Sequence, residues 1–180
     1  LELLVATVLS AQSTDVQINR VTEKLFKKYR TIEDYASADL MELENDIYST
    51  GFYKTKAKNI QATARLILER YDGKIPETME ELVTLPGIGR KTANIVLARG
   101  FGVIEGIAVD THVKRVSRRL GFTKHSDPKK IEQDLIALAP MKDLDRLSMT
   151  LIYHGRRVCR ARQPRCPSCV VNHLCPSSVI

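Results

Sequence analysis

Apolar side chains recur along most of this chain at the spacing of α-helices. Within residues 56–71 they stand at positions 57, 60, 64, 67, 68 and 71, and Gly73 follows as a stop. Residues 145–158 show a similar pattern, whereas the alternation typical of β-strands is weak throughout. The sequence therefore predicts an all-α protein of roughly eight to ten helices, because helices average about a dozen residues.

Three sites carry signals for the start of a helix. The segments Thr31–Asp34 and Thr78–Glu81 have the capping-box pattern, with aspartate as a weaker fourth residue in the first. Asp127 precedes Pro128, which places a cap residue before a proline at the first helical position.

The first eleven residues are apolar at eight positions, yet the run is too short to span a bilayer and contains Glu2. It also lacks the basic start of a signal peptide. We therefore expect a buried core helix here and no membrane association. Since the chain opens at Leu1 inside this helix, we also expect further residues upstream.

Glycines gather near the middle of the chain. Gly100, Gly102 and Gly106 are three of the nine glycines. This segment is the best candidate for a crossing between two helical lobes, which we assign to residues 1–104 and 105–180.

Charge is unevenly distributed along the chain. The 28 basic and 21 acidic residues give a net charge of +7, which is compatible with binding nucleic acid or an anionic membrane. Residues 31–50 carry six acids and no lysine or arginine, whereas residues 111–130 carry seven basic residues and one acid. The chain therefore predicts one basic face and one acidic face.

The segment Leu85–Lys91 reads LPGIGRK and lies between two helical patterns. Gly87 and Gly89 allow backbone conformations that other residues avoid and let a partner approach the main chain. We expect Leu85 and Ile88 to anchor the turn in the core and the next helix to offer free N–H groups to a phosphate. A lone Gly-x-Gly is more often a plain helix connection. The flanking Leu-Pro and Arg-Lys favour a helix–hairpin–helix motif, which holds the DNA backbone without reading its sequence.

Lys91 stands in the first turn after this hairpin. A lysine there is usually a solvated or phosphate-contacting charge. The helix dipole and Arg90 disfavour its ammonium form, and we expect partial burial against Ile88 and Ile95 to add to this effect. Because covalent catalysis requires a neutral amine, Lys91 is a candidate nucleophile.

Asp110 is the candidate acid partner of Lys91. It follows the apolar run 107–109 and precedes a helix predicted to end at Leu120. An N-cap is the commoner role of such an aspartate. The two roles are compatible, because a cap fixes the carboxylate in place.

All four cysteines of the chain fall in its last 22 residues with the spacing C-x6-C-x2-C-x5-C, and five arginines surround them: Cys159, Cys166, Cys169 and Cys175, with Arg156, Arg157, Arg160, Arg162 and Arg165. With no export signal, this cluster favours a metal in a reducing cytosol over disulfides. Four thiolates suit structural zinc, but zinc sites usually show two close cysteine pairs and only one is present here. The spacing therefore favours an iron–sulfur cluster and leaves zinc as the alternative.

Taken together, the motifs LPGIGRKTAN and VDTHVKRV and the cysteine spacing resemble the endonuclease III family of the helix–hairpin–helix DNA glycosylase superfamily. The opening LLVATVLSAQSTD and residues 51–59 resemble it too, so the match covers essentially the whole chain. The resemblance implies two α-helical lobes with a DNA cleft between them and a structural [4Fe–4S] cluster. It also implies that the helix which the family carries before this starting point is missing.

The family resemblance implies an activity and its substrate. The activity is that of a bifunctional DNA glycosylase and apurinic/apyrimidinic lyase, which removes oxidised pyrimidines in base excision repair through a Schiff base and β-elimination. The substrate is double-stranded DNA with damaged pyrimidines or abasic sites. We expect a monomer in a bacterial or archaeal cytosol, although nuclear and mitochondrial relatives exist.

The same resemblance assigns roles to residues of this chain. Lys91 is implied to attack the sugar carbon, and Asp110 to stabilise positive charge on the sugar. The remaining predicted contacts are with DNA, through the gap-filling Gln12, the wedge Phe52, the cleft residue His112, the hairpin glycines and the loop arginines Arg160, Arg162 and Arg165. A wedge is often leucine in the family, so Phe52 is a substitution that would stack more strongly. The four cysteines are implied to hold the cluster.

Three other functions fit the sequence less well. Adenine glycosylases of the superfamily lack the lysine and carry an extra domain, and thymine-mismatch relatives are also disfavoured by Lys91. A non-catalytic, zinc-stabilised DNA-binding module would use the same hairpin and basic face, but Lys91 would then only hold a phosphate.

Overall fold

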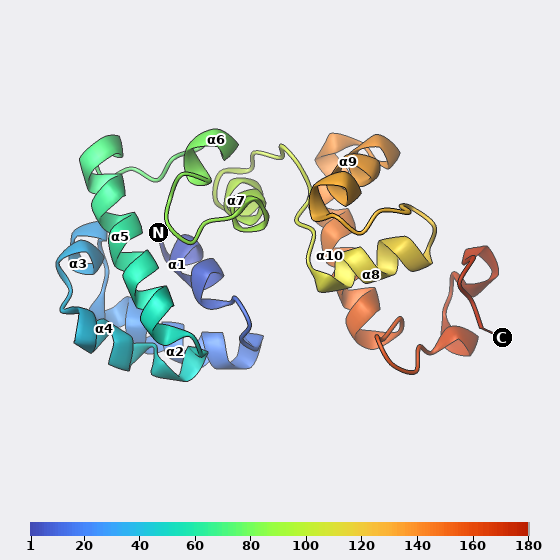
Figure 1. Ribbon diagram of the computed structural model, residues 1–180, viewed down its shortest axis with the longest axis horizontal. Helices are drawn as coiled ribbons and strands as arrows, with labels where there is room; N and C mark the ends of the chain where they lie inside the picture. Colours follow the sequence, from blue (N-terminus) through green and yellow to red (C-terminus); the bar gives the residue numbers. More distant parts are fainter. Residues whose placement is uncertain (180) are drawn as a thin grey trace. The chain divides into compact units, whose positions relative to one another are not determined.

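The computed structural model describes residues 1–179, and all the regular structure within this range is helical (Figure 1). The predicted all-α fold is confirmed. The chain forms two compact units, unit 1 from Leu1 to Phe101 and unit 2 from Gly102 onward. None of the described helices is long and apolar enough to cross a membrane.

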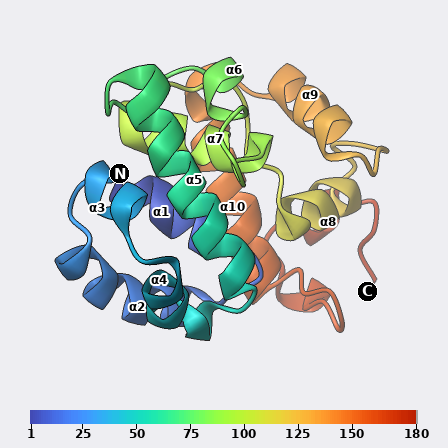
Figure 2. The same ribbon diagram turned by 60° about the vertical axis from the view of Figure 1, so that its left-hand side comes forward.

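Unit 1 is built around its longest helix, α5. Its regular elements are α1 (Glu2–Leu9), α2 (Asp15–Lys28), α3 (Ile32–Ser37), α4 (Leu40–Asp46), the 3-10 helix η1 (Tyr48–Thr50), α5 (Tyr53–Tyr71), α6 (Met79–Leu82), α7 (Arg90–Val96) and the π-helical turn η2 (Leu97–Phe101). Helix α5 packs against α1, α3 and α4 (Figure 2).

The core of unit 1 follows from the apolar face of α5. Ala57, Ile60, Ala64 and Ile67 are buried at the predicted helical spacing. The helix ends where Asp72 and then Gly73 adopt positive φ angles of 50° and 74°, so the predicted stop is confirmed.

The helix caps largely follow the sequence. At α3 the side chain of Thr31 accepts from the Asp34 N–H, and the Asp34 carboxylate accepts from the Thr31 N–H at 2.9 Å, so this capping box is complete. At α6 the Thr78 hydroxyl accepts from the Glu81 N–H but donates to the Glu81 carboxylate at 2.8 Å. The Glu81 carboxylate thus accepts from the Thr78 hydroxyl instead of from the Thr78 backbone N–H, which is the bond that a capping box predicts.

Unit 2 contains the helices α8 (Thr111–Arg119), α9 (Pro128–Leu138) and α10 (Leu144–Arg157), with the 3-10 turns η3 (Met141–Asp143), η4 (Cys166–Ser168) and η5 (Asn172–Leu174). Asp127 caps α9 by accepting from the Lys130 N–H at 3.1 Å, as predicted. The core of unit 2 consists of residues from all three helices and of one residue from the irregular segment before α8: Ile107, Val113, Val116, Ile131, Leu135, Leu144 and Leu151. The chain after α10 contributes little to this core, since no residue from 156 to 179 is buried.

Candidate functional site

The hairpin Leu85–Lys91 of unit 1 is anchored from below, as predicted. Leu85 and Ile88 are only 2% and 4% exposed, and the Ile88 N–H donates to the Leu85 carbonyl at 3.1 Å. The Thr63 hydroxyl of α5 donates to the Pro86 carbonyl at 2.9 Å. The two buried apolar side chains and the hydrogen bond from α5 together fix the position of the turn on unit 1.

The two glycines of the hairpin differ. Gly87 has φ +76°, and a Cβ placed on it would lie 2.6 Å from the Asn59 amide nitrogen, so both conformation and space require glycine. Gly89 has φ −92°, within reach of any residue, and a Cβ there would meet nothing within 4 Å. The prediction of a special backbone conformation is therefore right for Gly87 and wrong for Gly89. The space over Gly89 is open to a partner.

Lys91 lies at the start of α7 and is exposed. The expected partial burial is wrong, because the buried face of α7 consists of Ala93, Asn94 and Val96, and Lys91 lies off that face. Gly89 is the N-cap and supplies no side-chain bond to the first turn. The lysine amine is therefore accessible to a ligand that rests on the hairpin.

Asp110 of unit 2 is the N-cap of α8. One carboxylate oxygen accepts from the N–H groups of His112 and Val113, both at 2.8 Å. The other oxygen lies 3.2 Å from Nδ1 of His112. The two side chains are partly exposed, at 19% for Asp110 and 28% for His112. Three contacts therefore hold the carboxylate in one orientation, and they join it to His112, which the sequence placed separately among the DNA contacts.

Helix α10 supports this acid from behind. Gly155 is buried, and a Cβ on it would lie 3.0 Å from Val116 and 3.2 Å from the His112 Cβ. The Ser148 hydroxyl donates to the Ala108 carbonyl at 2.9 Å. Close packing at Gly155 thus sets the position of the Asp110–His112 turn. The sequence pattern gave no sign of this role beyond a glycine inside a helix.

Gln12 and Phe52 are exposed on neighbouring loops of unit 1, and both have left-handed backbones, with φ angles of 56° and 49°. Phe52 is 66% exposed although it is a large apolar residue. Such conformations cost a non-glycine residue energy and concentrate at functional sites. The loops are joined directly, because the Ser13 hydroxyl donates to the Thr50 carbonyl.

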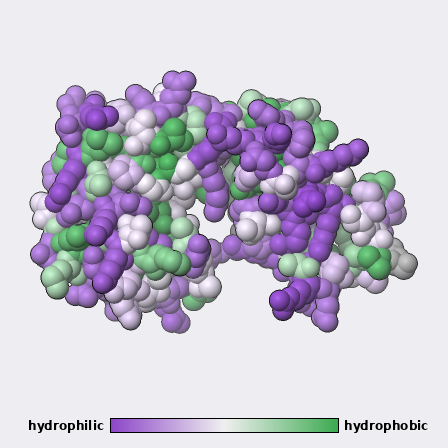
Figure 3. Space-filling model, viewed as in Figure 1, coloured by the Kyte–Doolittle hydropathy of each residue, from purple (hydrophilic) through white to green (hydrophobic). Residues whose placement is uncertain are grey.

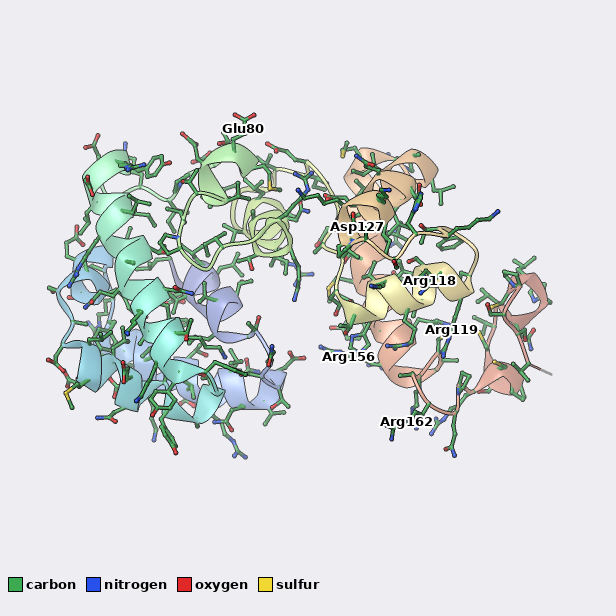
Figure 4. The ribbon with its side chains drawn as sticks, in the orientation of Figure 1. Glu80, Arg118, Arg119, Asp127, Arg156 and Arg162 are labelled. Carbon is green, nitrogen blue, oxygen red and sulfur yellow. The ribbon has the colours of Figure 1, made fainter. Side chains whose placement is uncertain are left out.

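The cysteines and arginines follow α10 in unit 2, where Arg160, Arg162 and Arg165 are all exposed. Figure 4 shows Arg162 projecting from the loop away from the helices. Gln163 beside it has φ 51°, the third left-handed residue on a predicted DNA-binding loop. This arrangement presents arginine side chains to solvent on a tightly turned backbone.

Two arginines of α8 hold this loop, a role that no motif in the sequence indicates. Arg119 donates to the carbonyls of Arg160 and Ala161 at 2.7 and 3.1 Å, and to the Cys159 sulfur at 3.4 Å. Arg115 donates to the carbonyls of Gly155 and Cys159 at 3.0 and 3.3 Å. Their spacing of four residues is the only signal in the sequence, since it puts both on one face of the helix.

All four cysteines are free, half-buried and line one cavity of about 130 Å³. Within residues 1–179, no three His, Cys, Asp or Glu side chains come close enough together to hold a single metal ion. A water molecule takes up about 30 Å³, so this cavity has room for several atoms. Four thiols around one such cavity are a donor set that fits an iron–sulfur cluster. Burial lowers the pKa of His154, whose Nε2 lies 3.7 Å from the Cys169 sulfur, so a neutral imidazole faces this cavity.

The predicted concentration of basic residues lies along α8. A groove there is lined by Lys114, Arg115, Arg118, Arg119 and Lys124, with no acid among its lining residues. Figure 3 shows hydrophilic side chains gathered over this part of unit 2. Such a groove suits the phosphates of a nucleic acid.

Comparison with known proteins agrees with this set of features. Residues 5–141 match the family model of the HhH-GPD superfamily base excision DNA repair proteins. An endonuclease III from Synechocystis sp. is 55% identical over 177 residues, which cover 98% of this chain and 81% of that protein.

Two solved structures of endonuclease III bound to DNA are also similar to this chain, each at 47% identity over 98% of it. One is a non-covalent complex with a TM-score of 0.92, of which 82% is covered. The other is a trapped covalent intermediate with a TM-score of 0.93, of which 83% is covered. The chain belongs to the HhH-GPD superfamily of base excision DNA repair proteins.

Proposed function

We propose that Lys91 is the nucleophile of this chain, a DNA glycosylase and abasic-site lyase of base excision repair. The main support for the proposal is that Lys91 is exposed and lies two residues after Gly89. The space over Gly89 is open, and the hairpin that contains it is anchored by buried side chains. A DNA backbone resting there would bring a deoxyribose to the amine without reading sequence. The related protein trapped as a covalent DNA intermediate supports this reading.

The proposed reaction begins when the neutral Lys91 amine attacks C1′ of the damaged nucleotide. A bond forms between Nζ and C1′, the bond from C1′ to the base breaks, and the base leaves with the electron pair. The Nζ lone pair then forms the C=N bond of a Schiff base as the C1′–O4′ bond breaks, and a proton lost from Nζ is taken up by O4′. Loss of a proton from C2′ and of the 3′ phosphate from C3′ completes β-elimination, and water releases Lys91 from the imine.

Asp110 acts in this scheme as a fixed negative charge. Positive charge develops on the sugar as the base departs, and a carboxylate held by three contacts needs no reorganisation to stabilise it. His112 bonds the second oxygen and so sets the direction in which the carboxylate points. Asp110 also assists proton transfer in this proposal.

The target nucleotide must leave the duplex before its sugar can be attacked from a protein site. Gln12 and Phe52 are the side chains that we propose to enter the space it vacates, Gln12 by hydrogen bonding and Phe52 by stacking. Their exposure and strained backbones support this role. The substrate is double-stranded DNA with an oxidised pyrimidine or an abasic site, and the protein acts as a monomer.

We propose that Cys159, Cys166, Cys169 and Cys175 hold a [4Fe–4S] cluster. When bound, the cluster supplies a cross-link between four points of a segment that lacks buried residues. Its cysteine ligands leave no iron open for substrate, so its role is structural. Arg160, Arg162 and Arg165 contact DNA phosphates from the loop that the cluster orders. A yellow-brown preparation supports the cluster, whereas a colourless zinc protein contradicts it.

Borohydride trapping tests the nucleophile. The protein is mixed with duplex DNA that contains an abasic site, and borohydride reduces any Schiff base to a stable secondary amine. We expect a covalent adduct from the wild-type protein and from Lys74→Ala, whose lysine is exposed elsewhere in unit 1, but none from Lys91→Ala. A folded wild-type protein that gives no adduct would instead be a non-catalytic DNA-binding module. An undiminished adduct from Lys91→Ala would show that another amine is the nucleophile.

A further inference from the structure

Lys56 is a buried lysine with three hydrogen bonds. Its side chain starts from the first turn of α5, and the residue is 5% exposed. Nζ donates to the Leu9 and Thr50 carbonyls at 2.8 Å each and to the Ser13 hydroxyl at 3.1 Å. The sequence did carry a signal for this burial, because Lys56 stands four residues before Ile60 on the apolar face of α5.

These three acceptors flank the two protruding side chains. Gln12 lies between Leu9 and Ser13, and Phe52 lies two residues after Thr50. The Ser13 hydroxyl also donates to the Thr50 carbonyl, which closes a triangle of bonds around the ammonium group. A further bond of 2.5 Å joins Gln17 to Ser49 farther along the same two segments. Lys56 is thus the common partner of both loops.

The two loops need such a partner. Gln12 and Phe52 hold left-handed backbones, which cost a non-glycine residue energy and persist only when the surroundings enforce them. Leu9 is the last residue of α1 and Thr50 the last of η1, so their carbonyls lack helical partners. The Lys56 ammonium satisfies both carbonyls, and at Leu9 it lies at the negative C-terminal end of α1.

Stability alone does not account for a lysine at this position. Burial lowers the pKa of Lys56, which means that desolvation opposes its charged form. Lysine is almost never buried without partners, and the oxygens that it meets here are neutral. An apolar side chain at this point would avoid desolvation but would leave the two loops unconnected.

We propose that Lys56 is a positioning residue that fixes the Gln12 and Phe52 loops to each other, so that both side chains enter the gap in the DNA as one rigid pair. This inference rests on the proposed role of Gln12 and Phe52 in the vacated space. Lys56 itself contacts no DNA, because it lies beneath the two loops. Its effect on DNA is transmitted through the spacing of the two residues above it.

A double-mutant cycle on DNA that cannot react tests this proposal. The probe is a duplex with a tetrahydrofuran abasic analogue and 2-aminopurine in the opposite strand, whose fluorescence reports insertion into the gap. We expect Phe52→Ala to weaken binding about tenfold in the wild type but less than about twofold in Lys56→Met, because the wedge is already misplaced there. We also expect Lys56→Met to lose the fluorescence change that the wild type gives.

Matched variants separate positioning from folding. Lys58→Met removes an exposed lysine from the same helix and should match the wild type in both measurements. Lys56→Arg keeps the charge and should restore part of the fluorescence change. If Lys56→Met does not fold, Ser13→Ala can replace it, because it removes the two hydrogen bonds of the Ser13 hydroxyl. Ser13→Ala should also reduce the effect of Phe52→Ala on binding, but by less than Lys56→Met does.

The proposal is overturned by additive losses from Phe52→Ala and Lys56→Met, or by a full fluorescence change in Lys56→Met. It is also overturned if Ser13→Ala leaves the effect of Phe52→Ala at about tenfold. A wild-type protein that binds the analogue duplex without any fluorescence change contradicts the proposed insertion itself. Failure of the borohydride trap, by contrast, bears on Lys91 alone, because the analogue duplex involves no chemistry.

Discussion

The hairpin of unit 1 and the cysteine loop of unit 2 present basic groups to solvent in opposite ways. The hairpin, Leu85–Lys91, rests on two buried apolar side chains and a bond from α5. The cysteine loop, residues 159–175, contains no buried side chain; two arginines of α8 hold it, and its four thiols line one cavity. The hairpin is thus shaped by the hydrophobic core, whereas the loop is shaped by polar contacts and, in our proposal, by the cluster that its cysteines bind.

The hairpin and the cysteine loop should therefore be disrupted by different changes. The hairpin should fail with its packing, and it should be indifferent to metal. If the proposed cluster is removed, the loop should lose its order, whereas most changes in the core of unit 1 should leave the loop unchanged. Variants in the hairpin and variants in the loop can therefore show how much each element contributes to DNA binding.

The largest effect is expected from removal of a cysteine that we propose as a cluster ligand. Cys169→Ser should give colourless protein and lower DNA affinity by at least about tenfold, because ligand binding and ordering of the loop are coupled. Visible absorbance and a binding titration measure the two effects. Val170→Ser, which adds the same hydroxyl at an exposed neighbour, should keep both colour and affinity. A coloured, fully active Cys169→Ser protein would contradict the role of this cysteine.

The second effect concerns the two hairpin glycines. Gly87→Ala should lower the free energy of unfolding by about 1–3 kcal/mol, because its φ is +76° and Asn59 fills the space. Gly89→Ala should change that free energy by less than about 0.5 kcal/mol, because the added methyl group meets nothing. It should still weaken DNA binding, because the methyl group would occupy the open surface that we propose for the DNA backbone. Denaturant titrations and binding curves test the pair. Equal destabilisation by both variants would contradict the distinction.

The third effect concerns the arginine that ties α8 to the cysteine loop. Arg119→Ala removes bonds to two carbonyls and one sulfur and should lower the free energy of unfolding of unit 2 by about 1–2 kcal/mol, since its partners are partly exposed. Protease cleavage within residues 159–166 should become faster. Arg118→Ala, next to it on α8 and exposed, controls for the lost charge and should leave the loop as resistant as before.

The smallest effect on the fold is expected at the tip of the loop. Arg162→Ala should leave the unfolding free energy within about 0.5 kcal/mol of the wild type, because the side chain is exposed. It should weaken DNA binding alike for all sequences and reduce the dependence of log affinity on log salt by about 1. A change in the preferred lesion would instead mean that Arg162 contacts a base.

Much of the fold could be predicted from the sequence because it depends on local patterns. The apolar face of α5, the stop at Gly73 and the cap at Asp127 each follow from a few neighbouring residues, and all three are confirmed. The burial of Leu85 and Ile88 followed in the same way.

The errors and omissions arose where distant segments meet. Lys91 was expected to be partly buried, but which face of α7 is covered depends on packing that the hairpin sequence does not contain. Arg119 bonds the carbonyl of Arg160 and Gly155 packs against another helix, so no local motif reveals their roles. The apolar face of α5 indicates that Lys56 is buried, but it does not indicate the bond to Leu9, which lies 47 residues away. The π-helical turn at Leu97–Phe101 is likewise absent from the sequence pattern, which reads as ordinary helix.

The cap geometry at Asp110 ties chemistry to side-chain length. Asparagine has the same reach and also caps helices well, so Asp110→Asn would keep the shape of the turn while removing its charge. Glutamate keeps the charge, but one added methylene would carry the carboxylate past the N–H groups of His112 and Val113. Asparagine can replace the cap and glutamate can replace the charge. Among the natural side chains, only aspartate supplies both the cap and the charge at this position.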